Sequence, residues 1–197
     1  MNGAESLVKT LVAGGVDICF ANPGTTEMRI VMALDQIEGM RCILGLTEIV
    51  VTGCADGYGR MAGRPAATLL HCGPGFANGI ANLHNARRAC TPIVNLVGDQ
   101  ASYHRPFDAP LTADTEGFAH AASDWVRVSA SADTIGADGA EALQQARTPP
   151  GRIATLIAPA ETTWQDGGRV ASPLPVPGRE EVMPDVIHAA AEALRSR

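Results

Sequence analysis

The sequence predicts an α/β fold, a doubly wound and mainly parallel sheet with helices on both faces, in three layers. Short runs that are apolar throughout alternate with segments of helical periodicity. Hydrophobic residues make up 46% of the chain but aromatic residues only 4%, so the core is built from small aliphatic side chains. Strands without polar alternation are buried on both faces, which is typical of parallel sheets that helices cover on each side.

Each element is recognised by its apolar pattern and by the glycine, proline or polar residues that end it. We expect strands over residues 17–21, 41–46, 66–70, 92–97, 125–129 and 152–158. We expect helices over residues 4–13, from Thr25 or Thr26 to 37, 48–62, 76–88 and 134–146, with a short helix after 115. Ligands of such sheets bind beyond the carboxyl ends of the strands, so the loops that follow the strands are the candidate site.

The chain divides into three parts. Residues 1–165 carry the α/β pattern, and residues 166–183 form a linker rich in proline and glycine. Residues 184–197 predict one amphipathic helix. Because a lone helix after a linker has little to pack against, we expect it to be the first helix of a middle domain that is truncated or absent here.

Composition excludes several classes of function. The formal net charge is -6 and no basic patch stands out in the sequence, so nucleic acid and membrane surfaces are not expected partners. The five cysteines form no CxxC motif and mostly fall in apolar runs, which indicates small buried side chains in a reducing compartment. No signal peptide or transmembrane run is visible, and we expect a cytoplasmic protein.

Glu48 is the most informative single residue. It lies where an apolar strand turns into an apolar, glycine-containing helix, a position where an ionised carboxylate is costly. Such an acid needs either a partner or a chemical task. The alternative is that it only complements the dipole at the start of the helix.

A glycine-rich loop between a strand and a helix also permits a dinucleotide interpretation. Gly73, Gly75 and Gly79 fit the spacing GxGxxxG, and Asp99 ends the next strand, where a ribose-binding acid would lie. Against this, Pro74 removes an N–H group from the phosphate-binding turn. A dinucleotide-binding domain of an oxidoreductase and a non-catalytic interaction module are therefore kept as alternatives.

Four loops in order match a known family. They are Asn-Pro-Gly-Thr-Thr-Glu at 22–27, Leu-Thr-Glu at 46–48, His-Cys-Gly-Pro-Gly at 71–75 and Gly-Asp-Gln at 98–100. Together they resemble the N-terminal, pyrimidine-binding domain of thiamine-diphosphate-dependent enzymes, in the acetolactate synthase and benzoylformate decarboxylase group. The resemblance covers residues 1 to about 165. It implies part, or one subunit, of a lyase or transferase that decarboxylates or condenses 2-keto acids.

The resemblance also implies roles for individual residues. Glu48 would hydrogen-bond the aminopyrimidine ring of thiamine diphosphate and so activate the cofactor, in an apolar pocket supplied by Leu46, Ile49 and Val50. His71 would be a second catalytic residue, moving protons near the substrate; otherwise it is a structural histidine. The residues implied to bind the cofactor are Pro23, Gly24, Glu48, Gly73, Pro74 and Asn78. Those implied to contact the substrate are Thr25, which could instead cap a helix, His71, Gln100 and Leu111.

Other features set limits on this resemblance. Thr47 stands where a histidine often precedes the family's acid. The family holds the cofactor's diphosphate and Mg²⁺ on a separate C-terminal domain with a Gly-Asp-Gly motif, and this sequence has neither that motif nor an expected metal site. We therefore expect the chain to be inactive alone. It would need a second copy or a complementary diphosphate-binding domain or subunit. Gly53, Gly57 and Gly59 would let another backbone approach closely, either that of the partner or that of the chain's own sheet.

Overall fold

The computed structural model describes residues 1–196 and contains one sheet of six parallel strands, in the order β2-β1-β3-β4-β6-β5. The strands are β1 (Ile18–Asn22), β2 (Arg41–Leu44), β3 (Ala66–Leu70), β4 (Ile93–Asp99), β5 (Trp125–Val128) and β6 (Ile153–Pro159). Every neighbouring pair in this order is parallel. The predicted α/β fold is confirmed.

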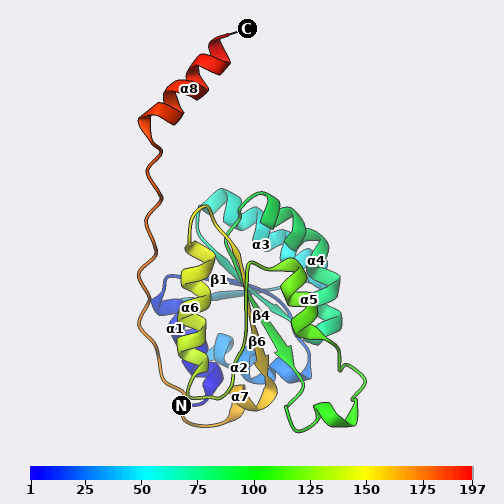
Figure 1. Cartoon of the computed structure of the whole chain (residues 1–197). Coiled ribbons are helices and arrows are strands. Elements are labelled where there is room, and N and C mark those ends of the chain that lie inside the picture. Colours follow the sequence, from blue (N-terminus) through cyan, green and yellow to red (C-terminus); the bar gives the residue numbers. More distant parts are fainter. Residues whose placement is uncertain (197) are drawn as a thin grey trace.

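Helices cover both faces of the sheet (Figure 1). One face carries α1 (Gly3–Ala13), α2 (Met28–Gln36) and α6 (Ile135–Arg147). The other face carries α3 (Glu48–Ala62), α4 (Cys72–Arg88) and α5 (Thr115–Ala122). Three shorter helices complete this part of the chain: η1 (Thr25–Glu27), η2 (Arg105–Phe107) and α7 (Ala160–Trp164).

The core consists of two apolar layers, one on each side of the sheet. Leu7 of α1 and Leu143 of α6 are buried in the first layer, and Phe76 of α4 is buried in the second. Successive strand residues alternate between them, so that Leu69 joins the first layer and Leu70 the second. Because both faces of β3 are covered, four of its five residues are apolar and Thr68 is the exception, which is why the sequence predicts the strand well.

Several boundaries differ from those expected. Helix α4 begins at Cys72 rather than near Phe76. Pro74 lies in the first turn, where backbone N–H groups have no partner within the helix, so the proline costs no hydrogen bond and does not interrupt the helix. The helix expected from Thr25 or Thr26 is divided into η1 and α2, and neither threonine caps it through its side chain.

The expectation about the cysteines is wrong for two of them. Cys42 and Cys54 are exposed, contrary to the expectation that the cysteines are small buried side chains. Within residues 1–196, no helix combines the length and the apolar character that crossing a membrane requires.

After the sheet the chain runs on as an extended segment. Residues 167–183 contain no helix or strand, and α8 (Pro184–Arg195) follows them. Figure 1 shows α8 standing away from the rest of the chain, and none of its residues is buried. One hydrogen bond, from Gln144 Nε2 to the carbonyl oxygen of Pro175 at 2.6 Å, ties the extended segment to α6. Arg197, the end of the expected terminal helix, lies outside the described residues.

The strand order has its switch point between β1 and β3, the position that is called the crevice in folds of this class. The chain passes from β1 outward to β2 and then returns to the other side of β1 to form β3. In sheets of this kind ligands bind at the switch point, beyond the carboxyl ends of the strands. The loops concerned begin at Asn22 and at His71.

Candidate active site

Glu48 is the first residue of α3, and its carboxylate is held from two sides. Its Oε2 accepts a hydrogen bond from Asn78 Nδ2 of α4 at 2.8 Å. Its Oε1 lies over Gly75, where an added Cβ would come within 2.5 Å of it. A glycine at 75 is therefore required for the carboxylate to take this place, and the sequence-predicted residues Glu48 and Asn78 are brought together.

The apolar pocket expected around Glu48 is not closed by this chain. Leu46 is 86% exposed, Ile49 and Val50 are also exposed, and Glu48 itself is only half-buried. The expected neighbours thus form an apolar surface beside the carboxylate instead of burying it, because they sit at the start of α3 with nothing packed on them.

This surface continues along α3. Val50, Cys54, Gly57 and Met61 follow one another at helical spacing and are all exposed. A Cβ at Gly57 would meet no atom within 4 Å, whereas one at Gly59 would press on Thr91 of the same chain. Gly59 is therefore needed for close packing within this chain. Gly57 has no such neighbour, and the space beside it is unoccupied.

His71 follows β3 and stands at the start of α4. Its Nδ1 lies 2.7 Å from Oε2 of Glu27, and its side chain is 22% exposed. The backbone of Gly24 covers the face of the ring so closely that a Cβ there would overlap three ring atoms. The structure therefore brings the predicted residues Gly24 and His71 together at the crevice between β1 and β3.

Glu27 is a site residue that the sequence analysis missed. Its side chain is fully buried, and its Oε2 also accepts the backbone N–H of Gly24 at 2.7 Å. Because a carboxylate only accepts hydrogen bonds, the ring of His71 donates from Nδ1, which leaves Nε2 as its free nitrogen. The sequence did contain a signal, because Glu27 is an acid within the motif of residues 22–27. Its partner His71, however, lies far away in the sequence.

Thr26 and Cys72 complete this network. Thr26 Oγ1 lies 3.3 Å from His71 Nδ1 and 3.4 Å from Cys72 Sγ, and it also contacts Glu27 Oε1. Glu27, His71 and Cys72 each place one metal-ligating atom within 4.8 Å of the others. Burial, however, raises the pKa of the Cys72 thiol to about 12. Since a cysteine must lose its proton to bind a metal, this cluster is better suited to hydrogen bonding than to holding a metal ion.

The other predicted site residues lie around this centre. Gly73 is buried against the segment before α5, where its added Cβ would lie 2.5 Å from the Cβ of Ala113. Pro23, Gln100 and Leu111 are partly exposed, and Thr25 and Pro74 are exposed. Across residues 1–196, no side-chain hydrogen bond joins Thr25, Gln100 or Leu111 to His71 or Glu48. Thr26, not Thr25, is the threonine in contact with the histidine.

Comparison with known proteins identifies the family. Residues 1–129 match the family described as "Thiamine pyrophosphate enzyme, N-terminal TPP binding domain", thiamine pyrophosphate being thiamine diphosphate. The chain belongs to this family. Its relatives include the Mycobacterium tuberculosis protein named "Putative acetolactate synthase large subunit IlvX", 53% identical over 196 residues, which cover 100% of this chain and 38% of that protein. Benzoylformate decarboxylase of Pseudomonas aeruginosa is 34% identical over 137 residues, which cover 69% of this chain and 26% of that enzyme.

A solved structure shows the same fold. The thiamine diphosphate-dependent 4-hydroxybenzoylformate decarboxylase of Rhodococcus jostii RHA1 superposes with a TM-score of 0.85 at 22% identity, over 100% of this chain and 38% of that one. The chain thus corresponds to an N-terminal thiamine-diphosphate-binding domain and spans well under half the length of these relatives.

The two alternative functions are not favoured by these matches. The family itself is one of thiamine pyrophosphate enzymes. In addition, Asp99, the acid that a dinucleotide site would need, is only 1% exposed. Burial raises its pKa, and its Oδ2 lies 3.4 Å from Arg105 Nη2. A carboxylate enclosed in this way is not presented to a ribose at the edge of the sheet.

Proposed function

We propose that this chain is the cofactor-activating N-terminal part of a thiamine-diphosphate enzyme that decarboxylates a 2-keto acid or condenses it with a second molecule. The observation that carries the proposal is the Glu48 carboxylate, which Asn78 holds at the carboxyl edge of the sheet beside an exposed apolar surface. When bound, thiamine diphosphate supplies the electron sink that cleavage of a bond to the keto carbon requires.

The residues present fit this cofactor. One Glu48 oxygen is already engaged by the Asn78 amide, and the glycine at 75 keeps the space beside the other free of a side chain. The apolar side chains of Leu46, Ile49 and Val50 would line the flat face of an aromatic ring placed against the carboxylate. Glu48 would then share a proton with a ring nitrogen of the aminopyrimidine. A partner surface that covers the site would exclude water and so strengthen this interaction.

His71 would serve as the second catalytic residue. Glu27 holds its Nδ1, so the proton that His71 gains or loses is carried by Nε2. Gly24 fixes the plane of the ring by covering one face. The role proposed for His71 is to deliver or receive a proton at the substrate, and Gln100 and Leu111 are proposed to line the substrate side of the crevice.

A complete site needs further protein. We propose that Mg²⁺ and the cofactor's diphosphate are held by a C-terminal domain or a second subunit, and that the exposed face of α3 packs against it. Residues 166–183 would then be the linker that follows a pyrimidine-binding domain of residues 1–165, and α8 would open the middle domain. The chain's five cysteines are free, as suits the cytoplasm of a cell.

The decisive experiment is Glu48→Gln in the complete enzyme, with the diphosphate-binding domain or subunit present. The substitution keeps the side chain's size and its contact with Asn78. It replaces the carboxyl group by an amide, which cannot exchange a proton with the cofactor. We expect turnover of the 2-keto acid to fall by about 100-fold or more, the range lost with a general acid–base residue. Thermal unfolding should be unchanged, because Glu48 is only half-buried.

A matched control is Glu38→Gln, the same chemical change at an exposed position. It should leave turnover as in the unmodified enzyme. If Glu48→Gln also kept full turnover, Glu48 would not be the activating acid and the proposal would fail.

A further inference from the structure

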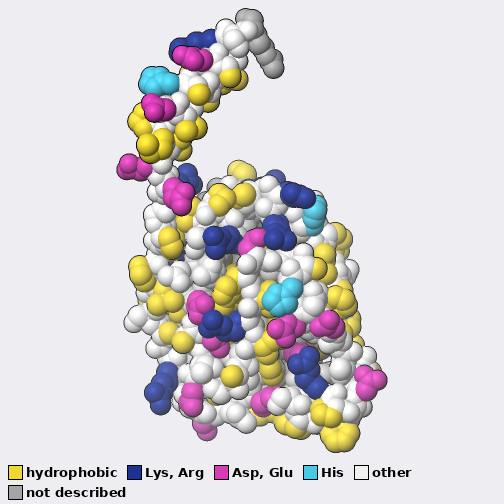
Figure 2. Space-filling view, in the orientation of Figure 1, with side chains coloured by type: hydrophobic (Ala, Val, Ile, Leu, Met, Phe, Trp, Pro, Cys, Tyr) yellow, Lys and Arg dark blue, Asp and Glu magenta, His cyan; other side chains and the backbone are white. Residues whose placement is uncertain are grey.

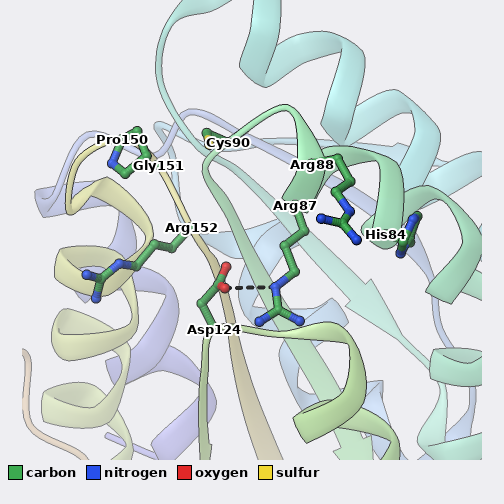
Figure 3. Close-up of a pocket in the computed structure, with 8 residues that line it drawn as sticks. All are labelled: His84, Arg87, Arg88, Cys90, Asp124, Pro150, Gly151 and Arg152. Carbon is green, nitrogen blue, oxygen red and sulfur yellow. Dashed lines mark hydrogen bonds and ion pairs between the residues drawn. The ribbon is translucent and has the colours of Figure 1, made fainter.

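The opposite edge of the sheet, at the amino ends of the strands, gathers arginine side chains. Two cavities of about 520 Å³ and about 500 Å³ lie there and share Cys90, Pro150 and Gly151 in their walls. A third hollow beside them is lined partly by the extended segment before α8. The arginines that line these cavities are Arg60, Arg64, Arg87, Arg88, Arg147, Arg152 and Arg179. Figure 3 shows the first cavity, with Arg87, Arg88 and His84 on one side and Arg152 on the other.

This concentration of positive charge corrects the expectation that the chain has no basic patch. Nearly half of its fifteen basic residues lie at one edge of a chain whose net charge is -6. Among residues 1–196, the carboxylates that line the three hollows are those of Asp124 and Glu180. In the space-filling view, dark blue side chains accompany a histidine over this part of the domain (Figure 2). The patch was hidden in sequence because its members come from segments spread over more than a hundred residues.

Existing ion pairs use only part of this charge. Three of the seven arginines are paired: Arg87 Nε lies 2.9 Å from Asp124, Arg60 pairs with Asp56 on the same helix at 2.8 Å, and Arg64 Nη2 lies 2.5 Å from Asp17. Among the described residues, Arg88 and Arg147 have no carboxylate within 4 Å. Arg147 is half-buried, and burial lowers its pKa from the ordinary value. An unpaired guanidinium in such a place gains from a bound anion.

Neutralisation of helix ends explains some of these residues but not all. Arg60, Arg88 and Arg147 lie in the last turns of α3, α4 and α6, where a cation stabilises the helix dipole. That effect is confined to the last turn. It does not account for Arg152 and Arg179, which lie outside any helix and line the same hollows. The charge is therefore arranged around cavities as well as around helix ends.

We propose that this edge is a binding site for a small molecule that carries two linked phosphate groups. A guanidinium offers a planar pair of donors that matches phosphate oxygens, which makes arginine the common residue for phosphate recognition. Arg88 lines one of the two adjoining cavities and Arg147 the other, and the cavities share the wall of Cys90, Pro150 and Gly151. An anion with two charged groups that lies across this wall would draw on both groups of arginines. Each cavity is also of the size that small ligands occupy.

The site lies at the edge opposite Glu48 and His71, so it is distinct from the one proposed for the cofactor's pyrimidine ring. The diphosphate could belong to inorganic pyrophosphate, to a nucleoside diphosphate or to thiamine diphosphate itself. The test therefore uses inorganic pyrophosphate as the probe. ADP, thiamine diphosphate and phosphate-free thiamine serve as separate arms.

The experiment is calorimetric titration of the 197-residue chain with pyrophosphate at constant ionic strength. We expect saturable binding with one molecule per chain, weakened by added NaCl because partly exposed charges are screened. Arg88→Gln combined with Arg147→Gln should weaken it by about 100-fold, about tenfold for each charged hydrogen-bonding group lost. Arg29→Gln, the same change on α2 at the opposite edge, should leave the affinity unchanged. Arg88→Lys, which keeps the charge but not the fork, should give an intermediate loss even if the double variant fails to fold.

Several results would overturn the proposal. Absence of saturable pyrophosphate binding would do so, as would equal weakening by Arg29→Gln. A double variant that unfolds at a lower temperature but binds pyrophosphate unchanged would show that the arginines act only on the helix ends. Binding of thiamine as tight as that of thiamine diphosphate would show that phosphate is not what is recognised. Tighter binding of ADP or thiamine diphosphate than of pyrophosphate would support the site and identify the source of the diphosphate.

Discussion

Glu27 and His71 form a hydrogen-bonded pair across the crevice, with Oε2 and Nδ1 2.7 Å apart. The two residues lie 44 positions apart and follow different strands, β1 and β3. The same oxygen accepts the backbone N–H of Gly24, and the second oxygen of Glu27 is in contact with the hydroxyl of Thr26. Three donors therefore converge on one buried carboxylate, which fixes both the orientation and the tautomer of the histidine.

The first prediction concerns Glu27→Gln. A glutamine offers one acceptor oxygen where the carboxylate offers two, so at least one of the three donors loses its partner. We expect the free energy of unfolding to fall by about 1–3 kcal/mol, the usual result of leaving a buried donor without an acceptor. We also expect His71 to lose its preference for the Nδ1-protonated tautomer, which the nitrogen chemical shifts of the ring report in an NMR spectrum.

Glu116→Gln is a suitable comparison, because Glu116 is exposed and its contact is with His120 at 3.6 Å. It should change neither the stability nor the His71 spectrum. Unaltered ring shifts of His71 in the Glu27 variant would show that the carboxylate does not set the tautomer.

The second prediction concerns Gly75→Ala. Alanine favours a helix over glycine, and α4 could accept it without backbone strain. The new methyl group would, however, lie 2.5 Å from Glu48 Oε1 and would push the carboxylate away from its place beside Asn78. We expect thermal stability to stay within about 1 kcal/mol of the original, while cofactor-dependent turnover of the complete enzyme falls about tenfold or more through the misplaced acid.

Gly178→Ala provides the comparison, since a Cβ at that position meets no atom within 4 Å among the described residues. It should affect neither quantity. Full turnover in the Gly75 variant would mean that Glu48 can act from another position, and the contact with Gly75 would then have no catalytic role.

The sequence predicts some parts of this molecule much better than others, for physical reasons. Strand β3 is apolar except for Thr68 because both faces of it are buried, and Glu48 is conspicuous because an acid contrasts with its apolar neighbours. Glu27 could not be assigned to the site, because it meets His71 only when β1 and β3 become neighbours in the sheet. No local sequence pattern shows that pairing. The arginines of the basic edge are separated in sequence for the same reason.

Exposure is predicted less well than fold. Leu46 and Val50 read as buried because hydrophobicity alone does not distinguish a chain's own core from a surface that awaits a partner. Cys42 reads as buried in an apolar run, but β2 is an edge strand and its side chain is exposed.

The last prediction concerns this edge strand. Cys42 lies directly opposite Cys19 of β1 in the sheet register. The neighbouring thiol of Cys19 favours the Cys42 thiolate and lowers the pKa of Cys42 to about 7, while the pKa of buried Cys19 is raised. Since the thiolate is the reactive form, alkylation of Cys42 by iodoacetamide should accelerate as the pH rises and reach half its maximal rate near pH 7. Mass spectrometry of the modified peptide measures that rate.

Two substitutions of Cys19 test whether its thiol is the group that lowers the pKa of Cys42. Cys19→Ala removes the donor, so the pKa of Cys42 should return toward about 8.5 and its alkylation at pH 7 should slow by about tenfold or more. Cys19→Ser keeps a hydroxyl donor at the same place and should preserve most of the reactivity. Cys54, which is exposed on α3, serves as the internal reference. An unchanged alkylation rate at Cys54 shows that the reagent is active and that the variant is folded. An identical pH profile for Cys42 in the serine and alanine variants would rule out Cys19 as the group that activates it.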